Sequence, residues 1–183
     1  LDVARSGSDY TVACITVDGR VESMRSWQSD DLMVTAKKTM QLAREWNVEA
    51  KNVHVDLDGL GAGVIDRMRE DGWGVDGVDF GGGAKHDWNW LVGDELKILN
   101  RRAELHWVGR MALMNGHIAV PREWRNTLWR QLGWTNYEYN EKGLLKMESK
   151  DKIRARHGNS PDHADAFFLS LSRANTGPKI FII

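Results

Sequence analysis

Residues 53–63 read Val-His-Val-Asp-Leu-Asp-Gly-Leu-Gly-Ala-Gly, a short apolar run that ends in a carboxylate and leads into glycines. This pattern predicts a buried strand over 53–56 and a helix that continues to about residue 71. A second strand is expected over 74–80. Strand, helix and strand in this order form the unit of a mixed sheet covered by helices, so the fold class is α/β.

The segments ahead of this unit have strand character. Residues 1–4 are short and apolar, residues 10–17 are rich in β-forming side chains, and Asp18-Gly19 is a strong turn signal before 20–27. We expect an antiparallel meander here. Asp2 lies at the very start of the pattern, as if an upstream part of the first strand preceded it. We therefore expect residues 1–183 to form one domain that is a fragment of a larger chain.

The remainder alternates between helical and strand patterns. Ser29 or Asp30 would cap the first helix, Ser160 would cap the last, and Pro161 would take the first position of that last helix. The stretch 149–158 is basic. The spacing predicts helices over 30–46, 93–115, 122–132 and 160–173, a brief strand over 117–120, and a hairpin of 134–140 with 143–148.

Composition excludes several classes of protein. A length of 183 residues is enough for one domain with a real core. The net charge of −1 argues against a protein that simply coats DNA, but it allows an enzyme whose acidic centre offsets a basic surface. The single cysteine, Cys14, cannot form an intrachain disulfide, which suggests a reducing cytoplasm. No apolar run approaches the roughly 20 residues of a membrane span.

Four carboxylates are candidates for catalysis. Asp2 lies in the first predicted strand and Asp56 ends the fourth, and the ends of central strands meet at one crevice in sheets of this type. Asp162 and Asp165 lie three residues apart, on one face of the last helix. Crowded carboxylates need a cation, and hard oxygen ligands suit Mg²⁺ or Mn²⁺.

Simpler interpretations exist for each of these residues. Asp162 alone would most often stabilise a helix N-terminus. A strand-end carboxylate such as Asp56 often only makes a turn, although Asp58, just before a glycine, is the more obvious turn former. Asp2 by itself indicates little. The hypothesis therefore depends on the four residues together.

Other polar residues are candidates for auxiliary roles. Asp9 and Asp58 could assist the four carboxylates, and His163 could be a proton donor, although a surface role is the simpler interpretation. Glycines 59–63 lack the lysine and hydroxyl residue of a nucleotide-binding loop, so tight packing at a helix start explains them better. No zinc-protease or serine-hydrolase motif is present.

A basic run precedes the last helix. A run of this kind is usually a solvated face, but cations beside a metal site could position DNA phosphates. Lys85, which follows three glycines, could also reach a phosphate. The predicted DNA-binding residues are Lys85, Lys146, Lys150, Lys152, Arg154 and Arg156.

The order and spacing of these motifs resemble one family, the C-terminal nuclease domain of the large terminase subunit of tailed phages. The resemblance covers nearly the whole chain. Its segments are Leu-Asp-Val-Ala at 1–4 with Gly7 and Asp9, Val-Asp-Leu-Asp-Gly-Leu-Gly-Ala-Gly-Val at 55–64, Asn-Arg-Arg-Ala-Glu-Leu at 100–105, Gly-His-Ile-Ala-Val-Pro at 116–121, Glu-Ser-Lys-Asp at 148–151 and Ser-Pro-Asp-His-Ala-Asp-Ala at 160–166.

The resemblance implies a ribonuclease H-like fold with an added β-hairpin over about 134–148. It also implies an endonuclease that cuts concatemeric viral double-stranded DNA during genome packaging in the host cytoplasm. The implied partners are a packaging ATPase domain, absent from this sequence, with the portal and the small terminase subunit. We expect the isolated domain to be a monomer and to bind no membrane.

The family's acidic cluster would correspond here to Asp2, Asp56 and the Asp162/Asp165 pair. Two divalent cations about 3.5–4 Å apart would activate a water and stabilise the leaving oxygen. Asp2 would bridge both cations, Asp56 would bind one, and Asp162 or Asp165 the other. Without metal, crowding should raise at least one carboxyl pKa.

Three alternatives stay open. The first is a Holliday-junction resolvase or transposase-like nuclease with the same fold and the same metals. The second is a non-catalytic DNA-binding or assembly module, which would leave the acidic cluster without a purpose. The third is a generic α/β domain in which the motif matches are accidental.

Overall fold

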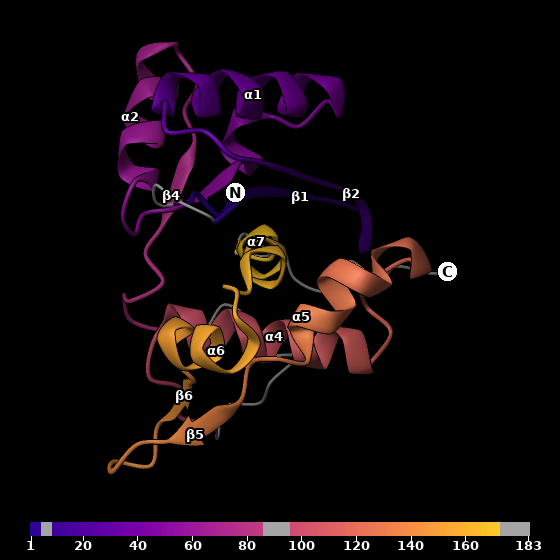
Figure 1. Cartoon of the computed structure of the whole chain (residues 1–183), viewed down its shortest axis with the longest axis vertical. Coiled ribbons are helices and arrows are strands. Elements are labelled where there is room, and N and C mark those ends of the chain that lie inside the picture. Colours follow the sequence, from indigo (N-terminus) through magenta and orange to yellow (C-terminus); the bar gives the residue numbers. More distant parts are fainter. Residues whose placement is uncertain (5–8, 86–95, 173–183) are drawn as a thin grey trace.

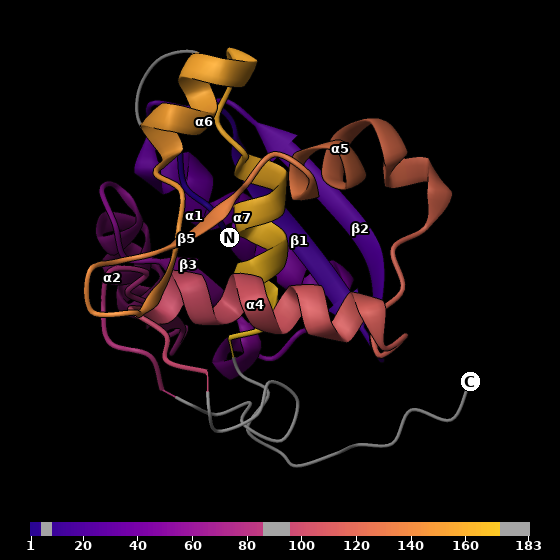
Figure 2. The ribbon, with the colours of Figure 1, turned by 90° about the horizontal axis from the view of Figure 1, so that it is seen from below.

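The computed structural model describes residues 1–4, 9–85 and 96–172. Strands form its middle layer, with helices on both sides (Figure 1). Helices α1 (Leu32–Glu45) and α2 (Gly61–Glu70) lie on one side of the strands. On the other side α7 (Asp162–Ser170) packs against the sheet, and α4 (Arg101–Met114) crosses beneath it (Figure 2).

The predicted meander begins with the antiparallel pair β1 (Thr11–Val17) and β2 (Arg20–Trp27). Their connecting turn, at Asp18 and Gly19, has φ angles of 45° and 75°. A two-residue turn with positive φ at both positions matches the right-handed twist of the two strands, which is why Asp-Gly predicts a hairpin. The hairpin is confirmed.

Residues at the start of the chain join this hairpin to the parallel pair β3 (His54–Asp56) and β4 (Asp76–Val78). The backbones of Asp2 and Val12 exchange two hydrogen bonds of 2.9 Å, and Asp56 N–H donates to the Leu1 carbonyl at 3.0 Å. Antiparallel and parallel pairing therefore meet at residues 1–2, and the predicted mixed sheet is confirmed. The strand expected over 1–4 is reduced to a single bridge at Asp2.

Each face of the sheet has its own apolar core. Val55 faces the side that α1 and α2 cover, where Ala36, Met40 and Val64 are also buried. The opposite side packs Val12 against the apolar face of α7. Because both faces of the sheet are covered, polar side chains at the strand ends are held by a rigid frame.

Some predicted boundaries are wrong. Helix α4 begins at Arg101, not at 93, because Asn100 caps it by accepting a hydrogen bond from Ala103 N–H at 3.0 Å. Residues 96–100 are not helical, and 86–95 lie outside the described residues. Helix α1 is capped by Asp31, not by Ser29 or Asp30.

The second half differs from prediction in its local geometry. The helix expected over 122–132 is divided into a 3₁₀ turn (Arg122–Trp124), a π turn (Arg125–Trp129) and the short α5 (Arg130–Leu132). The strand expected over 117–120 is a single bridge between Ala119 and Arg20. The predicted hairpin is confirmed as β5 (Tyr137–Tyr139) and β6 (Leu145–Met147).

The basic stretch 149–158 forms a helix, α6 (Lys150–His157). Ser149 caps this helix, and Gly158 ends it with a φ of 79°. Helix α7 begins one residue later than predicted, so Pro161 and not Ser160 takes the cap position. Within the described ranges, none of the helices is long and apolar enough to cross a membrane.

Candidate active site

The structure brings three of the four predicted aspartates to one cleft of about 270 Å³. Asp2 comes from the bridge to β1, Asp56 ends β3, and Asp162 begins α7. Asp165 lies one turn further along α7, fully buried beside the cleft. The cleft is lined by Asp2, Val3, Ala4, Asp9, Asp56, Asp58, Lys150, Asp151, Arg154, Ser160 and Asp162.

A glycine fixes the position of Asp56. A Cβ on Gly61 would lie 1.6 Å from the carbonyl oxygen of Asp56, so only glycine permits α2 to start this close to the end of β3. Asp58 donates its N–H to Asp56 Oδ1 at 3.1 Å, which closes a turn directly after the strand. The packing role predicted for the glycine-rich stretch is confirmed at Gly61.

Lys150 lies among the carboxylates. As the first residue of α6 it places its Nζ 2.9 Å from Asp165 Oδ2 and 3.6 Å from Asp2 Oδ1. About a third of its side chain, 34%, stays exposed. We predicted from the sequence that Lys150 binds DNA, whereas in the structure it contacts the carboxylates of Asp2 and Asp165.

Asp165 has two further cationic or polar neighbours, both on α4. His106 Nε2 lies 3.3 Å from Asp165 Oδ1, and Arg102 Nη2 lies 3.8 Å from the same oxygen. Phe168 stacks on the His106 ring at 3.8 Å. His106 and Arg102 were not among the residues predicted from the sequence. Their spacing of four residues, which puts two basic side chains on one helix face, was the available signal.

Burial and crowding change how the carboxylates titrate. Burial, opposed by Lys150, raises the pKa of Asp2 to about 7, and burial raises that of Asp56 to about 6. Burial also raises the pKa of Asp162. Burial alone would raise the pKa of Asp165, but Lys150 and the α4 residues lower it. The expected rise in carboxyl pKa is therefore found, but burial is its main cause, and the neighbouring carboxylates add less to it.

The chemistry of these side chains fits a divalent cation. Their oxygens are hard ligands, and burial makes the charge of Asp2, Asp56 and Asp162 costly unless a positive charge accompanies it. Within residues 1–4, 9–85 and 96–172, no group of three Asp, Glu, His or Cys side chains is close enough together to coordinate one metal ion. Lys150 supplies the positive charge between Asp2 and Asp165 instead.

Most of the other predicted DNA-binding residues pair with acidic side chains. Arg154 Nη2 lies 2.8 Å from Asp9 Oδ2, and Lys146 and Lys152 approach Glu138 at 3.3 and 3.7 Å. Arg156 Nη2 donates to Glu148 Oε2 at 2.8 Å and to the Trp134 carbonyl at 2.6 Å. Arg156 is therefore tied to the protein itself, whereas the three exposed pairs are weak enough to exchange partners.

The two remaining candidates, Lys85 and His163, do not line the acidic cleft. Lys85 is exposed, and its backbone N–H donates to Glu104 at 2.9 Å. His163 donates its backbone N–H to Gln131 Oε1 at 2.7 Å, and its ring nitrogen Nδ1 lies 3.4 Å from Gln131 Nε2. These contacts fasten the start of α7 to α5 and favour a structural role for His163.

Comparison with known proteins gives a consistent result at the level of the fold. No protein-family model and no curated protein matches the sequence. The nuclease domain of the large terminase subunit gp2 of bacterial virus Sf6 superposes with a TM-score of 0.72 at 19% identity, over 93% of this chain and 85% of that one. The fold is that of a terminase nuclease domain. The expected resemblance and the ribonuclease H-like fold are confirmed.

A second terminase nuclease, from the thermophilic phage G20c, superposes with a TM-score of 0.60 at 15% identity, over 94% of this chain and 78% of that one. Solved forms of these terminase nucleases include a lysine-to-alanine mutant of the Sf6 domain with manganese and beta-thujaplicinol and the G20c domain with bound magnesium. At such identities the likeness establishes the fold, and the chemistry must be argued from this chain's own residues.

Proposed function

We propose that this chain is a divalent-metal-dependent endonuclease that cuts double-stranded viral DNA during genome packaging. The observation that carries the proposal is the acidic centre, in which Asp2, Asp56 and Asp162 line one cleft and Lys150 links Asp2 to Asp165. The terminase nuclease fold supports it, because the four aspartates lie on the sheet and on the helix that packs against it.

The proposed cofactors are two divalent cations, Mg²⁺ or Mn²⁺, held by Asp2, Asp56, Asp162 and Asp165. When bound, such ions activate water and stabilise the charge that develops on a phosphodiester. Asp2 binds a cation only as a carboxylate, so the proton that burial leaves on part of the Asp2 population near pH 7 must depart first. Lys150 must also turn away from at least one oxygen.

Basic side chains of the protein supply the contacts to the DNA backbone. Arg154 lines the cleft in an exposed pair with Asp9, so a phosphate can replace that carboxylate at little cost. Lys146 and Lys152 extend positive charge from the cleft toward the β5–β6 hairpin. Contacts of this kind carry no base information, so we propose cutting with little sequence preference.

The biological setting follows from the same proposal. Residues 1–183 would be the nuclease domain of a larger chain that includes a packaging ATPase. They would act with the portal and the small terminase subunit in the host cytoplasm. The isolated domain would be a monomer and a weak nuclease, since those partners are what would deliver DNA to it.

The test is cleavage of supercoiled plasmid by the purified domain in Mg²⁺, in Mn²⁺ and in EDTA. The proposal predicts nicked and linear products with either metal and none in EDTA. A folded sample that cuts with neither metal would favour a DNA-binding or assembly module. A strong preference for four-way junctions over linear duplex would favour a Holliday-junction resolvase.

A further inference from the structure

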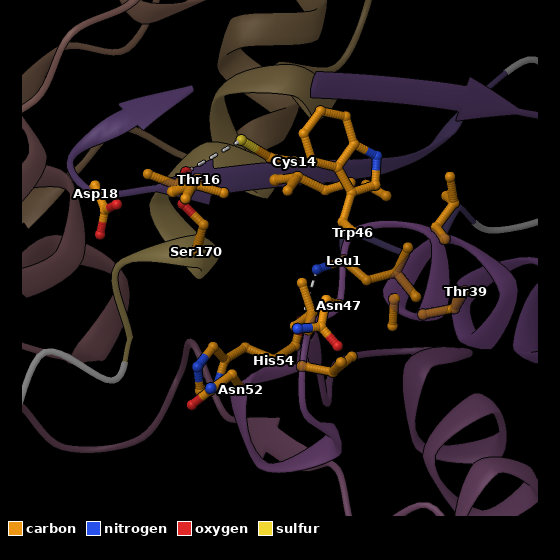
Figure 3. A pocket seen from close by; sticks show the side chains of 17 residues that line it. Leu1, Cys14, Thr16, Asp18, Thr39, Trp46, Asn47, Asn52, His54 and Ser170 are labelled. Carbon is orange, nitrogen blue, oxygen red and sulfur yellow. Dashed lines mark hydrogen bonds between the residues drawn. The ribbon is translucent and has the colours of Figure 1, made fainter. Parts of the chain in front are cut away.

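Helix α7, which carries Asp165, is held at both of its ends. Gln131 Oε1 accepts hydrogen bonds from two backbone N–H groups in the first turn of the helix. At its other end, Ser170 Oγ lies 3.0 Å from Thr16 Oγ1 on β1, beside a cavity of about 430 Å³ that none of the four aspartates lines (Figure 3). The backbone of Asp165 is therefore fixed, and its side-chain torsions decide where the two carboxylate oxygens point.

The two oxygens of Asp165 have different neighbours. Oδ1 lies 3.3 Å from His106 Nε2 and 3.8 Å from Arg102 Nη2, both on α4. Oδ2 lies 2.9 Å from the Nζ of Lys150, which lines the acidic cleft. One oxygen is thus held from the protein interior, and the other is directed toward the cation of the cleft. A carboxylate that rotated freely would offer neither oxygen in a fixed direction.

The ring of His106 is itself held in place. His106 is 4% exposed, and the Phe168 ring stacks on it with 3.8 Å between the ring centroids and 29° between the planes. Gly109 permits this stack, because a Cβ at that position would lie 2.5 Å from the Phe168 ring. Any larger residue at 109 would displace that ring. The close approach of α4 and α7 therefore fixes where Nε2 lies.

The contact with Asp165 also defines what His106 does chemically. An ionised carboxylate accepts hydrogen bonds and donates none, so Nε2 must carry the hydrogen and donate it to Oδ1. The same holds when a metal ion takes the place of Lys150, since a carboxylate binds the ion in its ionised form. Carboxylates that bind metal ions are commonly hydrogen-bonded by a second residue, and loss of that residue lowers metal affinity or activity about 10- to 100-fold.

We propose that His106 is a positioning residue of the acidic centre, whose hydrogen bond to Oδ1 holds Asp165 so that Oδ2 is presented to the divalent cation. This inference rests on the proposed nuclease function, since it takes Asp165 as a ligand of the metal ion. Arg102 does not replace His106 in this role. Its Nη2 is too far from Oδ1 for a hydrogen bond, and its Nη1 donates to the Glu148 carbonyl at 2.6 Å.

Four variants separate the hydrogen bond from the packing. His106→Leu and His106→Phe both remove the donor, and the second keeps a ring for Phe168 to stack on. His106→Gln keeps an N–H donor at the end of a side chain of similar length. Val108→Ala is the packing control, because Val108 is fully buried on the same helix and has no polar side-chain atom.

The measurements are the affinity for Mn²⁺ alone, by titration calorimetry, and the hydrogen on the His106 ring in the metal-free protein, by ¹⁵N NMR. The calorimetry is repeated with Asp165→Asn in the background. A residue that acts through the Asp165 carboxylate loses its effect when that carboxylate is absent, whereas a residue that acts only on stability does not.

We expect His106→Leu and His106→Phe to bind Mn²⁺ at least about 10-fold more weakly, and His106→Gln and Val108→Ala to stay within about 3-fold of the unmodified protein. In the Asp165→Asn background, removal of the donor should change the affinity by less than about 2-fold. The NMR spectrum should show the hydrogen on Nε2. Unchanged Mn²⁺ affinity in the two donor-free variants, an equal loss in His106→Gln, or a hydrogen on Nδ1 would each overturn the proposal.

Failure of this inference and failure of the nuclease proposal give different results. The expected pattern of Mn²⁺ affinities without plasmid cleavage by the unmodified protein would contradict the nuclease alone. Metal-dependent cleavage together with equal Mn²⁺ affinity in His106→Phe and the unmodified protein would contradict the positioning role alone. An unmodified protein that binds no Mn²⁺ would contradict both.

Discussion

The ammonium group of Lys150 lies 2.9 Å from Asp165 Oδ2 and 3.6 Å from Asp2 Oδ1, so one side chain links a carboxylate of α7 to the carboxylate at the Asp2–Val12 bridge. Asp165 and Asp2 raise the pKa of Lys150 despite its burial, and it therefore stays charged at any pH of interest. A cation that binds these oxygens must compete with this ammonium group.

Replacing the lysine should relieve that competition. We expect Lys150→Ala to bind Mn²⁺ at least ~10-fold more tightly than the unmodified protein, because two carboxylates lose their fixed counter-ion. Titration calorimetry measures the affinity. Lys152→Ala is the matched control, since Lys152 lies on the same helix but pairs with Glu138. Equal Mn²⁺ affinity in both variants would contradict the account.

The raised pKa of Asp2 predicts how stability depends on pH. A carboxyl group whose pKa is near 7 in the folded protein and 3.8 when exposed binds more protons folded than unfolded between these values. Its contribution to stability is therefore full at low pH and is lost as pH rises toward 7. Asp2→Asn, which mimics the protonated form, should escape this loss.

In metal-free buffer, the melting temperature of Asp2→Asn minus that of the unmodified protein should increase by about 4 °C or more between pH 5 and pH 8. The difference cancels the contribution of groups that both proteins share, such as His106, whose pKa burial lowers from 6.5 to about 4 on folding. A difference that stays constant with pH would show that Asp2 is already ionised at pH 5.

Gly61 should be irreplaceable. A methyl group at this position would overlap the carbonyl oxygen of Asp56, so Gly61→Ala must push α2 away from the end of β3. We expect a loss of about 3 kcal/mol or more in the free energy of unfolding, measured by urea titration. Gly74→Ala is the control, since no atom lies within 4 Å of its added Cβ, and its stability should change by under about 1 kcal/mol.

The exposed lysines beside the hairpin should contribute to DNA affinity without sequence preference. The double variant Lys146→Ala with Lys152→Ala should bind duplex DNA about 10-fold more weakly at low salt. Its log–log salt slope should be smaller by up to about 2, one for each lost phosphate contact. Fluorescence anisotropy across a salt series measures both. An unchanged slope would mean that these lysines only solvate the surface.

Much of the fold could be predicted because its determinants are local. Asp18-Gly19 specifies the first hairpin, and the stretch 53–63 specifies a strand that leads into a helix. Helix ends were less predictable, since each depends on which of several neighbouring residues makes the cap. Asp31, and not Ser29 or Asp30, caps α1. Helix α4 is capped by Asn100 and begins at Arg101, eight residues later than the apolar spacing predicted.

The acidic centre could be predicted in part. Asp2, Asp56 and Asp162 line one cleft, because the bridge at Asp2, the end of β3 and the start of α7 lie close together. The contacts of the basic residues were harder to predict, because the basic stretch 149–158 does not by itself indicate which of its side chains point into solvent. Lys150 turns into the centre, Arg156 bonds to Glu148, and His106 and Arg102 reach Asp165 from a helix that is distant in sequence.

The measurement that tests the central claim most directly is the rate of plasmid cleavage in about 5 mM Mn²⁺ by two matched variants. Asp56→Asn removes a buried carboxylate of the centre, whereas Asp66→Asn makes the same change at an exposed position of α2 that does not line the cleft. We predict a loss of at least about 100-fold for Asp56→Asn, with its fold retained, and a rate within about 2-fold of the unmodified protein for Asp66→Asn. Equal cleavage rates for the two variants would contradict the claim that this acidic centre cuts DNA.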